Sequence, residues 1–366
     1  MRRLMTGLAV VAAVGLFAGA ASAQVKIALN GPITGQLASF GEQMKRGAEM
    51  AVADLNAKGG VNGQKITLII GDDQCDPKQA VAVANRAAQE KVAAVIGHFC
   101  SGSSIPASDV YKEENILQIT PASTNPKYTD RGYKNTFRVC GRDDQQGIVA
   151  GDYIMEKYKG KNVAILHDKT AYGQGLADET KKRLNAKGVK EAMYEAITPG
   201  EKDYSALVSK MKAASIDLIY LGGYHPEGGL IVRQAKEQGL KAVLMGGDAL
   251  VDKQFWAISG AAGEGSLMTF DADPRKNPVA KPIVDKFKAG GYDPEGYTLY
   301  TYAAIQVWAE AATKAKSFKT ADVEKQMRSG KFSTVLNEIS FDAKGDTTSP
   351  AYKVYVWKNG SYDYVN

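Results

Sequence analysis

The sequence predicts an α/β protein built from two Rossmann-like lobes with parallel sheets. Short apolar runs at 93–96 and 117–120 lack charge on both faces, which is typical of buried parallel strands. Segments with apolar residues at helical spacing separate such runs along most of the chain, as in sheets covered by helices on both faces. Roughly 340 residues remain after an N-terminal segment is set aside, more than one core usually holds. We therefore expect two lobes.

The N-terminal segment has the features of a cleaved signal peptide. Arg2 and Arg3 precede an apolar, uncharged run to Ala20, and Ala21-Ser22-Ala23 forms a small-residue cleavage site. We expect residues 1–23 to be removed, Gln24 to begin the mature chain, and the protein to be soluble in the periplasm. A membrane anchor is the alternative, but strand-like sequence follows at once and no cysteine is placed for a lipid. No later run reaches the roughly 18 apolar residues that a membrane span needs.

Charge and cysteine content narrow the function classes. Loss of Arg2 and Arg3 changes the net charge from +6 to about +4, and the charges are interspersed, which gives no support for nucleic-acid binding. In an oxidising compartment two of the three cysteines can pair. We expect Cys75 to pair with Cys100, since each follows a predicted strand end on the same lobe; the loop closure would contribute about 3 kcal/mol. Cys140 is expected to be free and buried.

The predicted elements follow in two series. The first comprises strand 25–30, a loop over 31–41, a helix from about 44 that ends at Gly59-Gly60, strand 66–71, a helix to about 89, and strands 93–96 and 117–120 with a helix between them. A loop to about residue 142 leads into the second series. Its strands are expected over 162–166, 189–196, 217–221, 242–245 and 265–270, with late strands near 339 and 354. Its helices are expected over 144–158, 204–213, 279–289, 299–316 and 321–328, and two further helices end at 187 and at 238.

Polar turns follow two neighbouring strands of the first series. After 93–96 come Gly97 and several serines, and Pro106 is predicted in the first turn of a helix capped by Ser104. Strand 117–120 ends in residues 121–124, Pro-Ala-Ser-Thr. Free N–H groups and hydroxyls at a helix start suit a carboxylate or phosphate, and ligands of such sheets lie beyond the carboxyl ends of the strands. The pair predicts one polar notch, although either turn alone could be an ordinary capped helix.

Other candidate chemistries find less support. His98, His167 and His225 lie far apart without zinc-ligand spacing, so we expect hydrogen bonding at strand ends. Cys100 near His98 could suggest a nucleophile, but a disulfide would consume the thiol. Asp72-Asp73 is expected to cap and neutralise the lobe rather than to bind a metal. No phosphate-binding glycine motif follows a strand. The sequence thus predicts a binding protein with no catalytic residues, metal or cofactor.

Several motifs together resemble the periplasmic leucine/isoleucine/valine-binding proteins, the solute receptors of branched-chain amino-acid ABC transporters. The resemblance covers essentially the whole chain after residue 23. The motifs are Asp72-Asp73, Cys75 to Asn85, Val95 to His98, Thr120 to Ala122, His167 to Lys169 with Tyr172-Gly173, Gly200 to Asp203, and Gly222 to Glu227.

The resemblance implies the type I periplasmic binding protein fold, in which three crossovers join two lobes around a ligand cleft. It implies lobe 1 over 24–142 plus 272–351 and lobe 2 over 143–271 plus 352–366. It also implies a cysteine pair at Cys75 and Cys100, an amino-acid ligand, a monomer, and the membrane subunits of an ABC permease as partners.

Carried over by position, the resemblance implies a set of ligand-binding residues. Ser101 would bind the carboxylate, the Ala122 carbonyl would bind the ammonium, and Thr124 would touch both ends of the ligand. Asp248 would be the acid that binds the ammonium. The side-chain pocket would comprise Phe40, Phe99, Tyr172, Tyr224 and Tyr297.

Two of these positions depart from the family pattern. Asp248 stands where the receptors typically have Glu, and Phe99 stands where they have an aliphatic residue. Phe99 would fill volume that a leucine side chain occupies, and overfilling costs about 1 to 3 kcal/mol. We therefore expect preference for alanine, valine, proline or a γ-amino acid such as GABA over leucine. The alternatives are ordinary Leu/Ile/Val specificity after repacking, and a secreted amino-acid sensor on the same fold.

Overall fold

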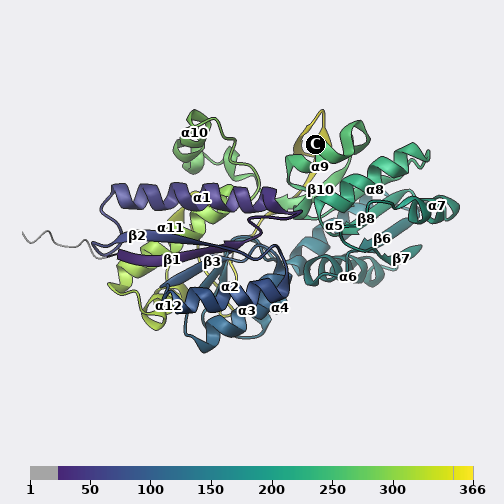
Figure 1. Ribbon diagram of the computed structural model, residues 1–366. Coiled ribbons are helices and arrows are strands. Elements are labelled where there is room, and N and C mark those ends of the chain that lie inside the picture. Colours follow the sequence, from purple (N-terminus) through teal and green to yellow (C-terminus); the bar gives the residue numbers. More distant parts are fainter. Residues whose placement is uncertain (1–23, 349, 366) are drawn as a thin grey trace, which may run out of the picture.

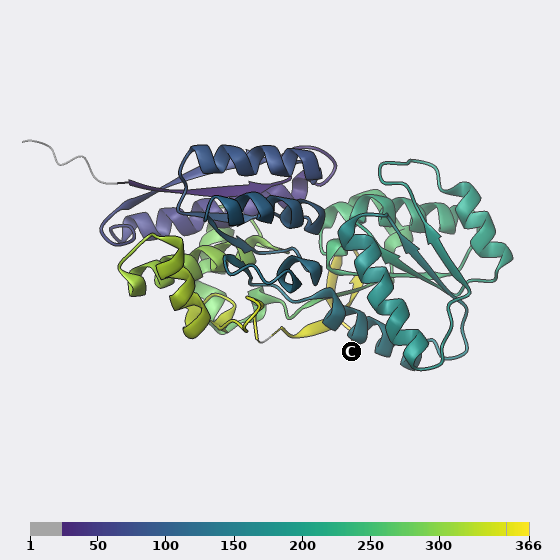
Figure 2. The ribbon, with the colours of Figure 1, turned by 90° about the horizontal axis from the view of Figure 1, so that it is seen from below.

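The computed structural model describes residues 24–348 and 350–365, so the predicted signal peptide lies outside the described residues. The described chain forms two lobes side by side, each a sheet flanked by helices (Figures 1 and 2). We call the lobe built on the five-stranded sheet the first lobe, and the lobe built on the seven-stranded sheet the second lobe. Across the described residues, every helix is too short or too polar to cross a membrane.

The first lobe is organised around a parallel sheet in the order β2-β1-β3-β4-β5. Alternate residues of the interior strand β1 belong to two different cores: Ile27 lies in the large core that includes Met44 of α1, whereas Ala28 lies in a smaller core with Ala84 of α2 and Tyr111 of α3. This alternation explains why β1 is apolar on both faces from Ile27 to Leu29. The elements are β1 (Gln24–Gly31), α1 (Ala38–Ala57), β2 (Lys65–Asp72), α2 (Pro77–Gln89), β3 (Ala94–Gly97), α3 (Ser101–Glu113), β4 (Leu117–Thr120), α4 (Lys127–Asp130) and β5 (Thr136–Arg138).

The second lobe has a mixed sheet in the order β14-β13-β10-β9-β8-β6-β7. The predicted parallel pairing holds from β10 to β7, whereas β13 and β14 pair antiparallel at the other edge. The elements are α5 (Asp143–Lys157), β6 (Val163–His167), α6 (Ala171–Ala186), β7 (Met193–Ala196), α7 (Ser205–Ala213), β8 (Leu218–Gly222), α8 (His225–Glu237), β9 (Val243–Gly246), η1 (Asp248–Leu250), α9 (Lys253–Ser259), η2 (Gly260–Gly263), β10 (Leu267–Asp271), β13 (Tyr352–Lys358) and β14 (Ser361–Tyr364).

Between β10 and β13 the chain returns to the first lobe. Helix α11 packs along α1, where a Cβ on Gly47 would lie 2.2 Å from the Thr298 carbonyl oxygen, so a glycine is needed at this crossing. The chain therefore passes between the lobes after β5, after β10 and before β13. The returning elements are η3 (Pro274–Lys276), η4 (Pro278–Ala280), α10 (Lys281–Ala289), α11 (Thr298–Ala315), α12 (Thr320–Ser329), β11 (Phe332–Thr334) and β12 (Asn337–Ile339).

Two local predictions are wrong. Helix α3 begins at Ser101 with Cys100 as its N-cap, so Ser104 is not the cap and Pro106 lies inside the helix. The backbone N–H groups of Ser103 and Ser104 both donate to the Cys100 carbonyl at 2.9 Å, which starts the helix earlier than the proline signal indicated. The predicted loop to residue 142 contains α4 and β5, which are only 4 and 3 residues long and too short to show a period.

Candidate functional site

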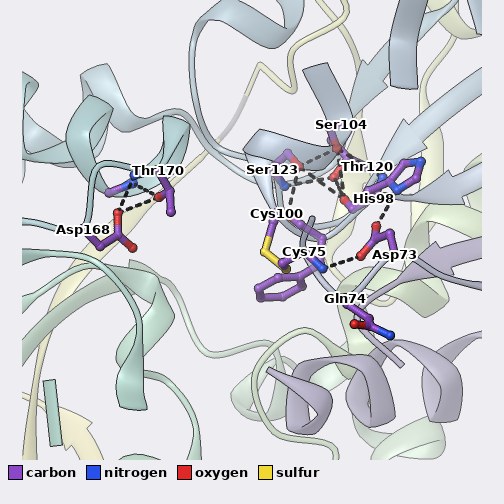
Figure 3. Close-up of a disulfide and its surroundings, with 12 residues drawn as sticks. Asp73, Gln74, Cys75, His98, Cys100, Ser104, Thr120, Ser123, Asp168 and Thr170 are labelled. Atoms are coloured by element: carbon purple, nitrogen blue, oxygen red, sulfur yellow. Dashed lines mark hydrogen bonds and ion pairs between the residues drawn. A yellow bond between two sulfur atoms is a disulfide. The ribbon is translucent and has the colours of Figure 1, made fainter. Parts of the chain in front are cut away.

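The turns after β3 and β4 are tied together by side-chain hydroxyls (Figure 3). Thr120 Oγ1 donates to the His98 carbonyl at 2.7 Å and accepts from the backbone N–H of Ser123 at 2.9 Å. Ser123 Oγ in turn donates to the Phe99 carbonyl at 2.9 Å and lies 2.6 Å from Ser104 Oγ. Every one of these hydroxyls is buried. The two turns therefore form one rigid unit at the carboxyl edge of the sheet.

A buried polar chain supports this unit from behind. His98 Nδ1 lies 2.5 Å from Asp73 Oδ2, and its Nε2 lies 2.8 Å from the Tyr111 hydroxyl, which Asn30 also contacts. The expected hydrogen-bonding role of His98 at a strand end is confirmed. Asp73 is fully buried and accepts from the Cys75 backbone N–H at 2.8 Å, so it fixes the turn that carries this cysteine.

The predicted disulfide is confirmed. Cys75 and Cys100 are bonded with their Cα atoms 5.5 Å apart, and Cys140 is free and buried, as expected. The bond joins the turn after β2 to the N-cap of α3 (Figure 3). It therefore restrains the backbone on both sides of Phe99 and Ser101.

The structure gathers the nine predicted site residues into one buried zone between the lobes. None of them is more than 7% exposed. The first lobe contributes Phe40, Phe99, Ser101, Ala122, Thr124 and Tyr297, and the second contributes Tyr172, Tyr224 and Asp248.

Aromatic rings make up much of this zone. Phe40 stacks on Phe99 with ring centroids 4.3 Å apart, and the edge of Tyr297 meets Phe99 at 5.0 Å. On the other lobe Tyr172 packs against Tyr224 at 5.0 Å. The tyrosine rings are hydrophobic but carry hydroxyls that need partners when buried.

Asp248 provides the partner for two of these hydroxyls. It follows β9 in the short helix η1, is 4% exposed, and accepts hydrogen bonds from Tyr172 at 2.9 Å and from Tyr297. Burial raises the pKa of Asp248, and the hydrogen bonds from Tyr297 and Tyr172 oppose part of that rise. No ion pair among the described residues involves Asp248. A carboxylate here lacks a cation.

A second acid, which the sequence analysis did not single out, lies beside it. Asp143 is the first residue of α5, is fully buried, and donates its backbone N–H to the Thr124 carbonyl at 2.9 Å. Neither of its carboxyl oxygens has a hydrogen-bond partner of good geometry, and the Thr124 hydroxyl also lacks one. Burial raises the pKa of Asp143 well above its ordinary value, and the charge of Asp248 adds to that rise. In the sequence, Asp143 looks like an ordinary acid at a helix start.

The lobes touch each other around this zone. Gln43 Nε2 donates to Asp252 Oδ2 at 3.0 Å, and Asn125 Nδ2 donates to the Ala171 carbonyl at 2.5 Å. Ser101 Oγ accepts the Asn125 backbone N–H at 3.2 Å, which connects this contact to the turn after β3. Together with the Tyr297–Asp248 bond, these contacts describe a closed arrangement of the two lobes.

The chemistry of this zone is that of recognition. The zone combines hydroxyls and backbone N–H groups with acidic side chains that have no cation, and aromatic rings pack among them. Over the described part of the chain, no group of three or more His, Cys, Asp or Glu side chains is placed to hold a metal ion.

Comparison with known proteins agrees with this reading. The sequence model of the family described as "periplasmic binding protein" matches residues 24–361. The chain is 50% identical to the Leu/Ile/Val-binding protein homolog 1 of Brucella suis, with 100% of both chains covered. It is 45% identical to the leucine-, isoleucine-, valine-, threonine- and alanine-binding protein of Pseudomonas aeruginosa, with 91% of this chain and 90% of the relative covered.

A solved structure shows the same architecture. The leucine-binding protein of Thermotoga maritima superposes with a TM-score of 0.86 at 31% identity, covering 93% of this chain and 98% of that one. The family is one of binding proteins rather than enzymes, in agreement with the sequence-based expectation. The expected fold is confirmed as well, and the chain belongs to the periplasmic binding protein family.

Proposed function

We propose that this protein is the solute receptor of an amino-acid ABC transporter and closes on one amino-acid molecule between its lobes. The chain would be exported to the periplasm after cleavage behind Ala23, and it would deliver its ligand as a monomer to the membrane subunits of a permease. We assign residues 24–142 plus 272–351 to lobe 1 and 143–271 plus 352–366 to lobe 2. Ligand would favour the closed state because it contacts both lobes.

The observation that carries the proposal is the buried Asp248 with no cation of its own. A buried carboxylate is costly unless a positive group meets it. The ammonium of an amino acid is such a group, and the Ala122 carbonyl supplies a further acceptor on the opposite lobe. Two tyrosine hydroxyls, one from each lobe, already orient Asp248. This arrangement supports a cation-binding pole.

The opposite pole would hold the ligand carboxylate. Ser101 lies at the first position of α3, where backbone N–H groups lack helical acceptors and the helix dipole favours negative charge. The Thr124 hydroxyl is buried without a partner of good geometry. A carboxylate between Ser101 and Thr124 would satisfy both.

We further propose a preference for small amino acids, proline or GABA over leucine. Phe99 is stacked on Phe40 and braced by Tyr297, so a bulky ligand side chain would have to displace a packed ring. Both tyrosines hydrogen-bond the Asp248 carboxylate, and the shorter side chain of Asp keeps it away from the cleft. This leaves room for a ligand whose ammonium lies further from its own carboxylate, as in GABA. The name of the Pseudomonas relative includes threonine and alanine as well as leucine, isoleucine and valine.

Ordinary Leu/Ile/Val binding is the second candidate, and the Brucella relative's name favours it. Titration calorimetry of refolded, ligand-free protein against alanine, valine, proline, GABA and leucine separates the two. Leucine should bind at least tenfold more weakly than the best of the other four, a difference of about 1.4 kcal/mol. Tighter binding of leucine than of all four would establish the second candidate, and no binding by any amino acid would reject both.

A further inference from the structure

A cavity of about 750 Å³ lies at the mouth of the interlobe cleft, outside the buried zone described above. Both lobes line it, and neither Asp143, Asp248 nor Thr124 belongs to its wall. Tyr224 is shared: it lines this cavity and packs on Tyr172 of the buried zone. We call this space the outer cavity.

The two walls of the outer cavity differ in chemistry. The first lobe presents only uncharged residues, among them Leu37, Ile105, Pro106 and the Cys75–Cys100 disulfide. The second lobe presents the charged residues of the wall, Asp168, Lys169 and Glu227. One side therefore offers aliphatic surface and the other offers two acids and one base.

Asp168 is the most constrained of these groups. It follows β6, is 1% exposed, and its Oδ1 accepts from the Thr170 backbone N–H at 2.9 Å and from the Thr170 hydroxyl at 2.7 Å. Its Oδ2 is buried without a hydrogen-bond partner. Figure 3 shows Asp168 and Thr170 on the opposite side of the view from the disulfide. An ionised carboxylate in this setting has an unmet need for a donor.

Glu227 lies close to Asp168 and adds to the negative charge. It stands in the first turn of α8, is 4% exposed, and its Oε1 accepts the Gly200 backbone N–H at 2.9 Å. Burial raises the pKa of Asp168 to about 6, against the hydrogen bonds from Thr170, and the charge of Glu227 adds to the rise. A pKa of about 6 leaves Asp168 mainly ionised at neutral pH.

Lys169, the basic residue of the wall, forms no ion pair with Asp168 or Glu227 among the described residues, and its side chain is exposed. The outer cavity thus has two acidic side chains, one of them with an unpartnered oxygen, opposite an aliphatic wall.

From this geometry we propose that the outer cavity is a second binding site for an aliphatic ammonium compound. The ammonium would donate to Asp168 Oδ2 and Glu227, and the alkyl chain would lie along Leu37, Ile105 and Pro106. The site would take an alkylamine of about four to six carbons independently of the amino acid between the lobes. It does not depend on the proposed ligand of the buried zone.

The test uses n-pentylammonium chloride as the probe, with pentan-1-ol and sodium pentanoate as uncharged and anionic counterparts. Titration calorimetry is carried out on the wild-type chain and on Asp248→Ala, which removes the acid of the buried zone. We expect saturable binding to both proteins with a dissociation constant on the order of 1 mM, within the limit for so few atoms. Neither counterpart should bind measurably.

Isosteric variants then locate the probe. Asp168→Asn with Glu227→Gln should weaken pentylammonium binding at least tenfold, while Lys169→Met should strengthen it two- to threefold by removing a competing cation. Glu237→Gln, at the other end of α8, is the matched control and should leave the affinity unchanged. Unchanged far-ultraviolet circular dichroism and amino-acid binding establish that the variants are folded.

Several results would overturn the proposal. Binding that disappears in Asp248→Ala would mean that the probe enters the buried zone instead. Equal binding of pentan-1-ol would mean that only the aliphatic wall is recognised. Absence of saturation in the wild type up to 50-fold above the expected constant, or full affinity in the double variant, would mean that the acids do not form a cation site.

Discussion

Two groups of buried charges, one in the first lobe and one between the lobes, differ in whether each acid has a base. In the first, Asp346 Oδ1 accepts from Arg138 Nε at 2.5 Å, and Oδ2 accepts from Arg142 Nη1 at 2.6 Å. Thr129 adds hydrogen bonds to both Asp346 and Arg138. Burial alone would raise the pKa of Asp346, but the two arginines together hold it below the ordinary value. Every charged side chain of this group has an oppositely charged partner, and Arg142 also pairs with the more exposed Asp130 and Asp144.

The second group contains acids alone. Asp143, Asp248 and Asp271 are all buried, and burial raises the pKa of each above its ordinary value. Asp271 still accepts two backbone N–H groups, from Gly141 at 3.2 Å and Ala351 at 3.0 Å, where the chain passes between the lobes. No arginine or lysine forms an ion pair with any of these three in the part of the chain that the structure describes.

The presence or absence of basic partners indicates a different role for each group. A buried charge set with all partners inside the chain contributes to one fixed conformation and has no need of a guest. A buried acid set without a base costs stability and is tolerated where an external cation completes it. Removing a charge should therefore have opposite consequences in the two groups, in stability for the first and in binding for the second.

The largest expected effect is on the complete group. Asp346→Asn leaves two guanidinium groups without their shared acid, and the buried Arg138 cannot reach water. We expect the free energy of unfolding to fall by about 3 to 5 kcal/mol, measured by urea denaturation with circular dichroism. Asp130→Asn is the matched control, because this acid also pairs with Arg142 but is 41% exposed; it should cost less than about 1 kcal/mol. Equal effects of the two variants would contradict the comparison.

The next effect should appear in binding instead of stability. Asp248→Ala removes the acid proposed to hold the ligand ammonium, and we expect a loss of about 2 to 5 kcal/mol in binding free energy, which abolishes measurable titration. The free energy of unfolding without ligand should change less than this, because removal of an uncompensated acid offsets the loss of the hydrogen bonds from Tyr172 and Tyr297. Asp143→Asn should weaken binding less. Retained micromolar affinity in Asp248→Ala would show that the ammonium lies elsewhere.

A pH dependence of stability should distinguish the groups further. Burial raises the pKa of Asp271 to about 6, so the folded chain holds this proton more tightly than the unfolded chain does. The resulting stabilisation is complete below about pH 4 and is lost as the pH rises through about 6, on the order of 1 to 3 kcal/mol. Asp346, with its lowered pKa, has the opposite sign and stabilises above about pH 4.

The measurement compares ligand-free wild type with Asp271→Asn. Urea denaturation at intervals from pH 4 to pH 7 gives the difference in free energy of unfolding at each pH. The wild-type advantage should shrink as the pH rises. A constant difference across the range would mean that Asp271 is ionised throughout.

The smallest effect concerns the side-chain pocket next to the acid group. Phe99→Leu removes a ring that stacks on Phe40 and should open space for a branched ligand. We expect leucine to gain about 1 kcal/mol relative to alanine, measured by calorimetry on both proteins. A gain of the same size for alanine would indicate general loosening of the pocket rather than a change in specificity.

Much of the fold could be predicted from the sequence because its signals are local, whereas the predicted site residues came from the family resemblance. Uncharged strands separated by amphipathic helices predicted two parallel-sheet lobes, and two cysteines after strand ends predicted the bond between Cys75 and Cys100. The predicted Ser104 cap failed because a short-range proline signal competed with backbone hydrogen bonds that start α3 four residues earlier. Strand β5 was missed because three residues cannot establish a period.

The sequence by itself determined the order of the elements and the kinds of side chain that follow each strand. Only the tertiary structure decided which acids share a buried space. Asp143 and Asp248 lie far apart in the chain, yet the fold of the second lobe brings them together. Burial, rather than residue type, raises the pKa of each. Asp346 has the same chemical identity, but the fold places it against Arg138 and Arg142. The sequence specifies which side chains can be charged, whereas the fold sets the distances that decide whether each charge has a partner of opposite sign.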